Sequence, residues 1–247
     1  MMQWGFSTIG CPDWDLKTAA AFGEKSGYPL LEVRVTGSDH PEKDFLRKLG
    51  EEKRCLILGT SFGVTTDADQ YRDMLKACAT LAAECSIPYV RIFGGCGFSE
   101  PFDDEKKANA KRNLEYFESL GLPTRLLLEA HDLFSSGKRI CELFESTGRT
   151  LPVIWDTYHT YFTGQESLSE SWDLLEPYII DVHIKDGNGK ELCLPGEGIF
   201  PMAELFALLK EKNYSGLITC EHEKMWHPEL PDMPEAFRAI DKFKGVL

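Results

Sequence analysis

Residues 125–159 read RLLLEAHDLFSSGKRICELFESTGRTLPVIWDTYH, and this stretch decides the fold that the sequence predicts. A short apolar run, Arg125–Glu129, is followed by a turn, a longer stretch with helical periodicity and a second apolar run, Pro152–Asp156. Short apolar runs separated by helical stretches are typical of strands that lie parallel in one sheet. The stretch therefore predicts one complete strand, helix and strand unit.

The same alternation extends over the whole chain. The predicted strands are Gln3–Thr8, Leu30–Val35, Cys55–Thr60, Tyr89–Phe93, Arg125–Glu129, Pro152–Asp156, Ile179–Ile184 and Leu217–Glu221. The clearest helices between them are Asp69–Ser86, which Pro88 follows, Asp103–Leu120, which Gly121 follows, and a helix that Pro201 opens and that runs to Lys212. Proline suits the first turn of a helix, and glycine or proline suits the position just past its end.

Eight such units in 247 residues predict an α/β protein with a (β/α)8 TIM barrel. An open doubly wound sheet is the alternative, but no GxGxxG motif follows the first strand. No linker rich in Pro, Gly or Ser and no low-complexity tract divides the chain. We therefore expect residues 1–247 to form a single barrel domain.

Composition indicates which partners to expect. The chain has 27 Lys and Arg against 40 Asp and Glu, a net charge of −13, which repels a phosphate backbone and predicts no nucleic-acid partner. The start MMQWGFSTIG resembles no signal peptide, and no apolar run is long enough to span a bilayer, so we expect a cytoplasmic protein without membrane association. The eight cysteines include no CxxC pair, which favours free thiols. The oligomeric state stays open, a homo-oligomer included.

Polar residues end the four late strands, and they predict a metal site. The active site of a barrel lies at the carboxyl ends of its strands. Glu129, Asp156, His183 and Glu221 reach that rim from four consecutive strands. Oxygen donors with one imidazole suit a single divalent ion such as Mn²⁺, Mg²⁺ or Co²⁺, with Zn²⁺ as an alternative.

At these residues the sequence resembles the xylose-isomerase-like TIM barrel superfamily, which includes ketose 3-epimerases, hydroxypyruvate isomerases, inosose dehydratases and apurinic-site nucleases. The resemblance is most specific in LLLEAHD, VIWDTYHTYF, VHIKDGNGKELCLPGEGIFP and ITCEHE. It implies that Glu129, Asp156, His183 and Glu221 are the metal ligands and that His159 lies beside the substrate or the metal. It also implies that Glu197, in the PGEG segment, contacts substrate hydroxyls or braces His183.

Some family features are missing from the sequence. The early strands LEVRV, LILGTS and VRIFGG contain no histidine, and PGEG replaces the DxH of the nucleases, so we expect one metal rather than three. Lys185 and Lys190 follow the seventh strand where the epimerases carry an arginine, which weakens the expectation of strict ketose 3-epimerase activity.

The predicted function is a metal-dependent sugar isomerase or epimerase that works through a metal-stabilised enediolate. Glu221 and Glu129 are expected to act as base and acid, in either order, and His159 to donate to a substrate oxygen. The expected substrate is a small sugar or sugar derivative. Substrate contacts are expected from Glu197, Lys185, Arg91, Trp4 and Phe6, and further candidates at the mouth are Arg34, Phe62, Phe93, Trp226, His131, His222 and His227.

Other functions fit the same residues. A dehydratase would begin with the same proton abstraction and then lose water. A relative of the apurinic-site nucleases and a sugar-binding barrel without catalysis also remain open. An arginine that reaches the cavity, Arg34 or Arg91, would favour an acidic or phosphorylated substrate.

Overall fold

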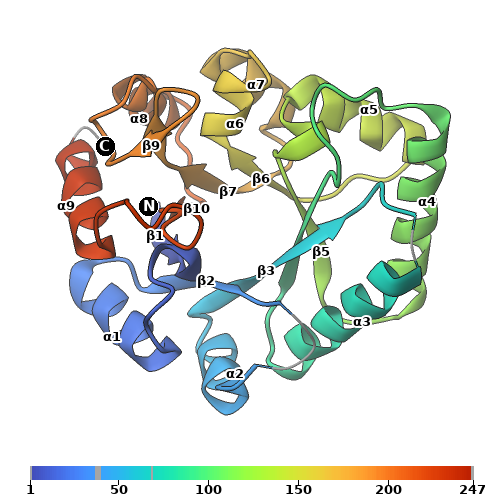
Figure 1. Ribbon diagram of the computed structural model, residues 1–247, viewed down its shortest axis with the longest axis horizontal. Coiled ribbons are helices and arrows are strands. Elements are labelled where there is room, and N and C mark those ends of the chain that lie inside the picture. The colour runs from blue at the N-terminus through green and yellow to red at the C-terminus, as the bar shows by residue number, and fades with distance from the viewer. Residues whose placement is uncertain (1, 37–39, 68, 246–247) are drawn as a thin grey trace.

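The computed structural model describes residues 2–36, 40–67 and 69–245 and contains a closed eight-stranded parallel barrel (Figure 1). The barrel strands are β1 (Gln3–Ser7), β2 (Leu30–Arg34), β3 (Cys55–Gly63), β4 (Tyr89–Phe93), β5 (Arg125–Glu129), β6 (Val153–Asp156), β7 (Ile179–Ile184) and β10 (Leu217–Cys220). Each strand pairs with its neighbour in sequence, and β10 pairs with both β7 and β1, which closes the cylinder. The predicted single-domain (β/α)8 barrel is confirmed.

Helices surround the barrel and connect its strands (Figure 1). They are α1 (Leu16–Ser26), α2 (Lys43–Glu51), α3 (Asp69–Glu84), α4 (Asp104–Ser119), α5 (Gly137–Thr147), α6 (Thr157–Phe162), α7 (Leu168–Leu175), α8 (Met202–Glu211) and α9 (Met233–Lys244), with 3-10 turns η1 (Thr8–Gly10) and η2 (Asp132–Phe134). The three helices predicted individually form within two residues of their predicted ends.

Local sequence signals set the helix ends. The Ser136 side chain accepts a hydrogen bond from the Arg139 N–H at the start of α5, and Gly148 ends this helix with φ of 67°. A left-handed residue just past a helix favours glycine because it has no Cβ to clash. These signals place α5 between β5 and β6, as the alternation in the sequence predicts.

Strand side chains alternate between the inside of the barrel and the surrounding helices. Ile57, Leu127, Ile154 and Leu217 form a small apolar cluster within the barrel, separate from the large core between strands and helices. Further toward the carboxyl ends, Glu129 and Asp156 follow Leu127 and Ile154 by two residues, and Glu221 follows Leu217 by four, just past the end of β10. Inside the barrel, the apolar cluster therefore lies next to a polar cluster at the carboxyl ends of the strands.

A short antiparallel hairpin, β8 (Asp186–Gly187) and β9 (Leu192–Cys193), follows β7 and was not predicted. All eight cysteines are free, and Cys96, Cys141 and Cys193 are the three that are not fully buried. Among the described ranges, no helix combines the length and the apolar character needed to cross a bilayer.

Candidate metal centre

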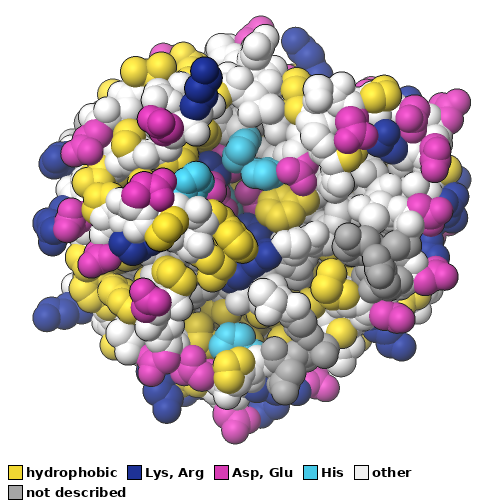
Figure 2. Space-filling view, in the orientation of Figure 1, with side chains coloured by type: hydrophobic (Ala, Val, Ile, Leu, Met, Phe, Trp, Pro, Cys, Tyr) yellow, Lys and Arg dark blue, Asp and Glu magenta, His cyan; other side chains and the backbone are white. Residues whose placement is uncertain are grey.

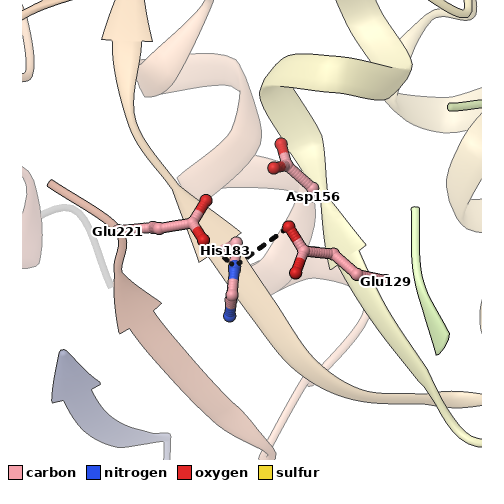
Figure 3. Close-up of side chains that lie close together, drawn as sticks. All are labelled: Glu129, Asp156, His183 and Glu221. Carbon is pink, nitrogen blue, oxygen red and sulfur yellow. Dashed lines mark ion pairs between the residues drawn. The ribbon is translucent and has the colours of Figure 1, made fainter. Parts of the chain in front are cut away.

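Four of the predicted site residues meet at the carboxyl end of the barrel. One donor atom from each of Glu129, Asp156, His183 and Glu221 lies within 4.8 Å of the other three, and all four residues are buried. Figure 3 shows the three carboxylates arranged around the imidazole. His183 Nδ1 lies 3.3 Å from Glu221 Oε1 and 3.8 Å from Glu129 Oε1, so this nitrogen faces the carboxylates.

Carboxylates also lie on the other side of the His183 ring. His183 Nε2 lies 3.1 Å from Glu32 Oε2 and 3.4 Å from Asp181 Oδ2. The Ser7 hydroxyl donates to Glu32, and the Thr219 hydroxyl donates to Asp181, which fixes both carboxylates. A carboxylate behind a histidine favours a proton on the nearer nitrogen and leaves the other lone pair free for an ion.

The donor set fits a divalent cation. His183 Nδ1, Asp156 Oδ2 and Glu129 Oε2 are buried and make no hydrogen bond, although buried polar atoms normally have a partner. Inside the barrel, the buried carboxylates of Glu32, Glu129, Asp156, Asp181 and Glu221 outnumber the two buried cations, Arg91 and Lys185. This surplus of negative charge and the imidazole nitrogen without a hydrogen bond suit one divalent ion. The ion would share Asp156 Oδ2 with Lys185 and Glu129 Oε2 with Arg91, which lie 2.8 Å and 3.0 Å from these oxygens.

Lys185 lies at one edge of this cluster. Its Nζ is 2.8 Å from Asp156 Oδ2, 2.6 Å from Glu221 Oε2 and 2.5 Å from Glu223 Oε1. Burial opposes the charge on Lys185, but the three carboxylates outweigh it and raise the pKa of Lys185 well above its ordinary value. Lys185 therefore stays charged. It contacts Glu221 Oε2, whereas Glu221 Oε1 faces His183, on the side where an ion would bind.

Arg91 lies at the opposite edge, beside Glu129. Its Nη1 is 3.0 Å from Glu32 Oε1, 3.0 Å from Glu129 Oε2 and 3.4 Å from Glu221 Oε1. The guanidinium also packs 4.5 Å from the centre of the Phe93 ring. Arg91 was predicted to contact substrate, and in the structure three carboxylates already surround it.

The two glutamates have different charge environments. Burial and the negative charge of Glu221 raise the pKa of Glu129 to about 7, although Arg91 opposes this. Burial also acts on Glu221, but Lys185 and His183 outweigh it and hold the pKa of Glu221 well below its ordinary value. Paired carboxylates with separated pKa values are typical of acid and base partners.

Asp156 and His159 are joined through α6. Asp156 Oδ1 accepts a hydrogen bond from the His159 N–H and thereby caps this helix, while His159 Nε2 lies 3.8 Å from Asp156 Oδ2. Burial lowers the pKa of His159 to about 3, so the ring is neutral. The His159 ring packs 3.9 Å from that of His131, and His131 rather than His159 lines the adjoining cavity.

A cavity of about 260 Å³ opens beside the four-residue cluster. It is lined by Ile9, Arg34, Ser61, Arg91, Phe93, Glu129, His131, Glu221, Glu223 and Trp226. Figure 2 shows charged and histidine side chains around the hollow at the centre of this face. Ligand sites for drug-sized molecules have volumes of roughly 300–1,000 Å³, so this cavity suits a smaller molecule.

Trp4 and Phe6 lie outside this cavity, contrary to the predicted substrate contacts. Both belong to the outward-facing positions of β1, because strand side chains alternate. Phe6 packs against Phe237 of α9, and Trp4 packs against Tyr28 and Phe206 in the layer between barrel and helices.

Glu197 also lies away from the cavity, and its side chain is exposed. The glycines of PGEG have a structural role instead: the N–H groups of Gly196 and Gly198 donate to Asp186 Oδ2. A Cβ on Gly198 would lie 2.2 Å from Asp186 Oδ1, so this approach requires glycine. The motif thus folds its loop around Asp186.

Some of the remaining aromatic and histidine candidates line the cavity, and others do not. Phe93 and Trp226 line the cavity, whereas Phe62 is buried away from it. His222 Nε2 lies 2.7 Å from the Pro231 carbonyl oxygen, and His227 lies beside Glu229. Neither of these two histidines lines the cavity.

The prediction from sequence missed Glu32, Asp181 and Glu223. Glu32 and Asp181 lie within the apolar strands β2 and β7, and Glu223 lies three residues after the end of β10. Glu32 lies two residues before Arg34, and Asp181 lies two residues before His183, so the alternation of strand side chains indicates that both carboxylates point into the barrel.

The geometry defines a class of protein: a (β/α)8 barrel with a candidate metal centre at the carboxyl ends of its strands. The family model for the xylose isomerase-like TIM barrel matches residues 20–243. The chain belongs to this family. No curated protein sequence matches the chain.

Solved structures with the same fold include several enzymes. The probable 3-DHS dehydratase AsbF of Bacillus anthracis has a TM-score of 0.76 at 17% identity, over 98% of this chain and 99% of that one. A D-allulose 3-epimerase from Methylomonas sp., in complex with D-allulose, has a TM-score of 0.75 at 18% identity, over 99% and 96%. The IolI protein with a bound zinc atom has a TM-score of 0.72 at 17% identity, over 98% and 96%. At these identities the similarity shows the fold.

Proposed function

We propose that the chain is a metal-dependent isomerase or epimerase that moves a proton next to the carbonyl of a small sugar or sugar derivative. The observation that carries this proposal is the convergence of Glu129, Asp156, His183 and Glu221 beside a cavity of about 260 Å³. The epimerase complex with D-allulose shares the fold and supports this class of activity, and the zinc atom bound to the IolI protein supports a metal in the site.

Glu129, Asp156, His183 and Glu221 would hold the ion in this proposal. A divalent ion in this position acts as a Lewis acid toward the carbonyl and hydroxyl oxygens of a substrate. Mn²⁺, Mg²⁺ and Co²⁺ suit the three carboxylates, and the zinc atom bound to the IolI protein supports Zn²⁺ as an alternative.

The chain's own carboxylates move the proton. Glu221, which Lys185 and His183 keep deprotonated, takes the proton from the carbon next to the carbonyl. Glu129, whose pKa burial raises to about 7 in the protein without an ion, would return a proton to carbon as the partner of Glu221. Both glutamates line the cavity, so both have access to a bound substrate.

Positioning of the substrate falls to the cavity walls. His131 lines the cavity and offers a ring nitrogen to a substrate oxygen, while the neutral His159 packs against it. Phe93 and Trp226 provide apolar surface for the carbon skeleton. Lys185 orients Glu221 and Asp156 from the far side of the cluster.

A dehydratase is the second candidate, because the same base would remove the same proton before water leaves. The probable dehydratase AsbF has the same fold. The two reactions give different products, so a product assay distinguishes them, whereas the residues of the site suit both.

Turnover in D₂O tests both candidates. The protein loaded with Mn²⁺, Mg²⁺, Co²⁺ or Zn²⁺ is incubated with ketoses, inososes and hydroxypyruvate, and products are followed by NMR and mass spectrometry. An isomerase or epimerase places deuterium on carbon without loss of water, whereas a dehydratase gives a product 18 mass units lighter. Absence of both signals with every metal and substrate would contradict the proposed function.

A further inference from the structure

Two arginines line the cavity beside the metal centre, and they differ in their partners. Arg91 contacts three carboxylates at 3.0–3.4 Å, which neutralise its charge. Arg34 has no carboxylate within 4.0 Å among the described residues of the chain. Its guanidinium donates a hydrogen bond to the Ser61 hydroxyl and lies over the Trp226 ring, 5.9 Å from the ring centre. Within the ranges that the structure describes, Arg34 is therefore a positive charge in the cavity without a carboxylate partner.

Arg34 is held in place from several directions. It ends β2, and its backbone N–H donates to Thr8 Oγ1 at 2.9 Å. Ser61, on β3, accepts from one end of the guanidinium, and Trp226 covers it from the segment after β10. The backbone N–H of Met225 donates to the Ile9 carbonyl at 2.8 Å and ties that segment to η1. A guanidinium with fixed orientation loses little conformational entropy when it binds a ligand.

The walls of the cavity carry opposite charges. Glu129 and Glu221 of the metal centre line one part of it, and Arg34 lines another. A ligand in this space would meet the carboxylates of the candidate metal centre and the guanidinium of Arg34 at the same time. A molecule with hydroxyl and carbonyl oxygens at one end and an anionic group at the other matches both walls.

We propose that Arg34 binds a carboxylate of the substrate, so that the substrate is a small hydroxy-keto acid or sugar acid rather than a neutral ketose. This inference rests on the proposed function for the reaction at the metal centre. The planar fork of arginine matches the two oxygens of a carboxylate. A carboxylate is favoured over a phosphate because the cavity is small and a single guanidinium with one hydroxyl faces it.

Binding of three matched compounds tests the inference without turnover. Glycerate, glycerol and glycerol 3-phosphate have the same three-carbon skeleton with a carboxylate, a hydroxymethyl group or a phosphate. Calorimetry with Mn²⁺-loaded protein measures each dissociation constant. We expect glycerate to bind at least 10-fold more tightly than glycerol and more tightly than glycerol 3-phosphate. A preference for the phosphate would overturn the proposed carboxylate.

Variants show whether the preference depends on Arg34, because a metal alone also attracts carboxylates. Arg34→Met should reduce the preference for glycerate over glycerol by about 10-fold or more, whereas Arg34→Lys should keep part of it. Arg47→Met is the matched control, since Arg47 lies on α2 and pairs with exposed Asp44. An unchanged preference in Arg34→Met, with unchanged Mn²⁺ affinity, would overturn the inference.

The same variants separate this inference from the proposed function. In D₂O, hydroxypyruvate and dihydroxyacetone differ by a carboxylate against a hydroxymethyl group. If wild-type protein exchanges deuterium into dihydroxyacetone as fast as into hydroxypyruvate, and Arg34→Met affects neither, the reaction stands and the role of Arg34 fails. If glycerate binds through Arg34 but no compound exchanges, the proposed reaction fails and the carboxylate site stands.

Discussion

His183 has carboxylates on both sides of its ring, so this one imidazole lies beside four acidic side chains of the buried cluster. Glu32 and Asp181 face Nε2, and Glu129 and Glu221 face Nδ1. Without an ion, this surplus of negative charge outweighs burial and raises the pKa of His183 well above its ordinary value. Binding of a divalent ion at Nδ1 therefore has to displace a proton, which makes metal affinity dependent on pH.

Glu221→Gln should reduce turnover by about 100-fold or more, because the amide has no basic oxygen and is a weaker metal ligand. The substitution keeps the size of the side chain, so the circular dichroism spectrum should stay the same. Initial rates with saturating metal give the measurement. Glu145→Gln, on the exposed face of α5, is the control and should keep wild-type rates. Wild-type turnover by Glu221→Gln would rule out the proposed base.

Glu129 should make the chelated protein less stable as pH rises. Its pKa is raised from 4.5 to about 7 in the folded protein, mainly by burial and by Glu221. The native state then binds the extra proton between these values, so this stabilisation is complete below pH 4.5 and is lost as pH rises through 7.

Urea unfolding at pH 5 and pH 7.5, with EDTA present, measures this effect. The free energy of unfolding should fall with pH in wild type and fall less in Glu129→Gln, which has no proton to lose. His131, whose pKa is raised mainly through its hydrogen bond to Asp132 despite burial, adds a loss above pH 6.5 in both proteins. Equal pH dependence in the two proteins would contradict the assigned environment of Glu129.

At the scale of elements, the segment between β7 and α8 is organised by one buried carboxylate. Asp186 accepts hydrogen bonds from the N–H groups of Gly187, Gly196, Gly198 and Phe200. Asp186→Ala leaves four donors without this partner and should lower the free energy of unfolding by about 3 kcal/mol or more. Asp73→Ala, at an exposed position of α3, should change it by less than about 0.5 kcal/mol.

Hydrogen exchange of residues 187–200 provides a second measurement for this loop. Asp186→Asn keeps one oxygen acceptor, so it should protect these amides better than Asp186→Ala and less than wild type. Protection that is equal in all three proteins would show that the loop does not depend on the carboxylate.

The elements themselves were largely predictable from the sequence. Four apolar runs predicted β4, β5, β7 and the end of β6 at the observed residues, because buried parallel strands need continuous apolar segments. The β8–β9 hairpin was missed, since two-residue strands leave no periodic pattern and depend on the contacts of Asp186. The direction of single side chains is harder to predict: Trp4 and Phe6, expected at the cavity, pack in the layer between barrel and helices.

The candidate site was predictable in its centre and not in its surroundings. Strand ends of a barrel converge, so Glu129, Asp156, His183 and Glu221 could be placed at one rim before any coordinates. The carboxylate partners of Lys185, and the lack of one beside Arg34 in the described part of the chain, depend on distances between separate strands, which one sequence does not contain. The direction of the loop that carries Glu197 also depends on such contacts, so its position away from the cavity could not be predicted.

At the scale of the whole molecule, the inside of the barrel holds a layer of apolar side chains and, next to it, a cluster of buried carboxylates. Buried carboxylates are costly without cations, and Arg91 and Lys185 compensate only part of the charge. Ligand binding to the native state adds stability in proportion to the logarithm of ligand concentration. The architecture therefore couples the stability of the whole barrel to occupancy of a small cluster at its rim.

The central claim is that one divalent ion binds between Glu129, Asp156, His183 and Glu221, and anomalous diffraction from crystals grown with Mn²⁺ tests it most directly. We predict one strong anomalous peak between these four side chains, about 2.0–2.3 Å from the donor atoms, and its loss in His183→Ala. A map with no peak at the cluster, or with manganese only elsewhere on the chain, would contradict the account.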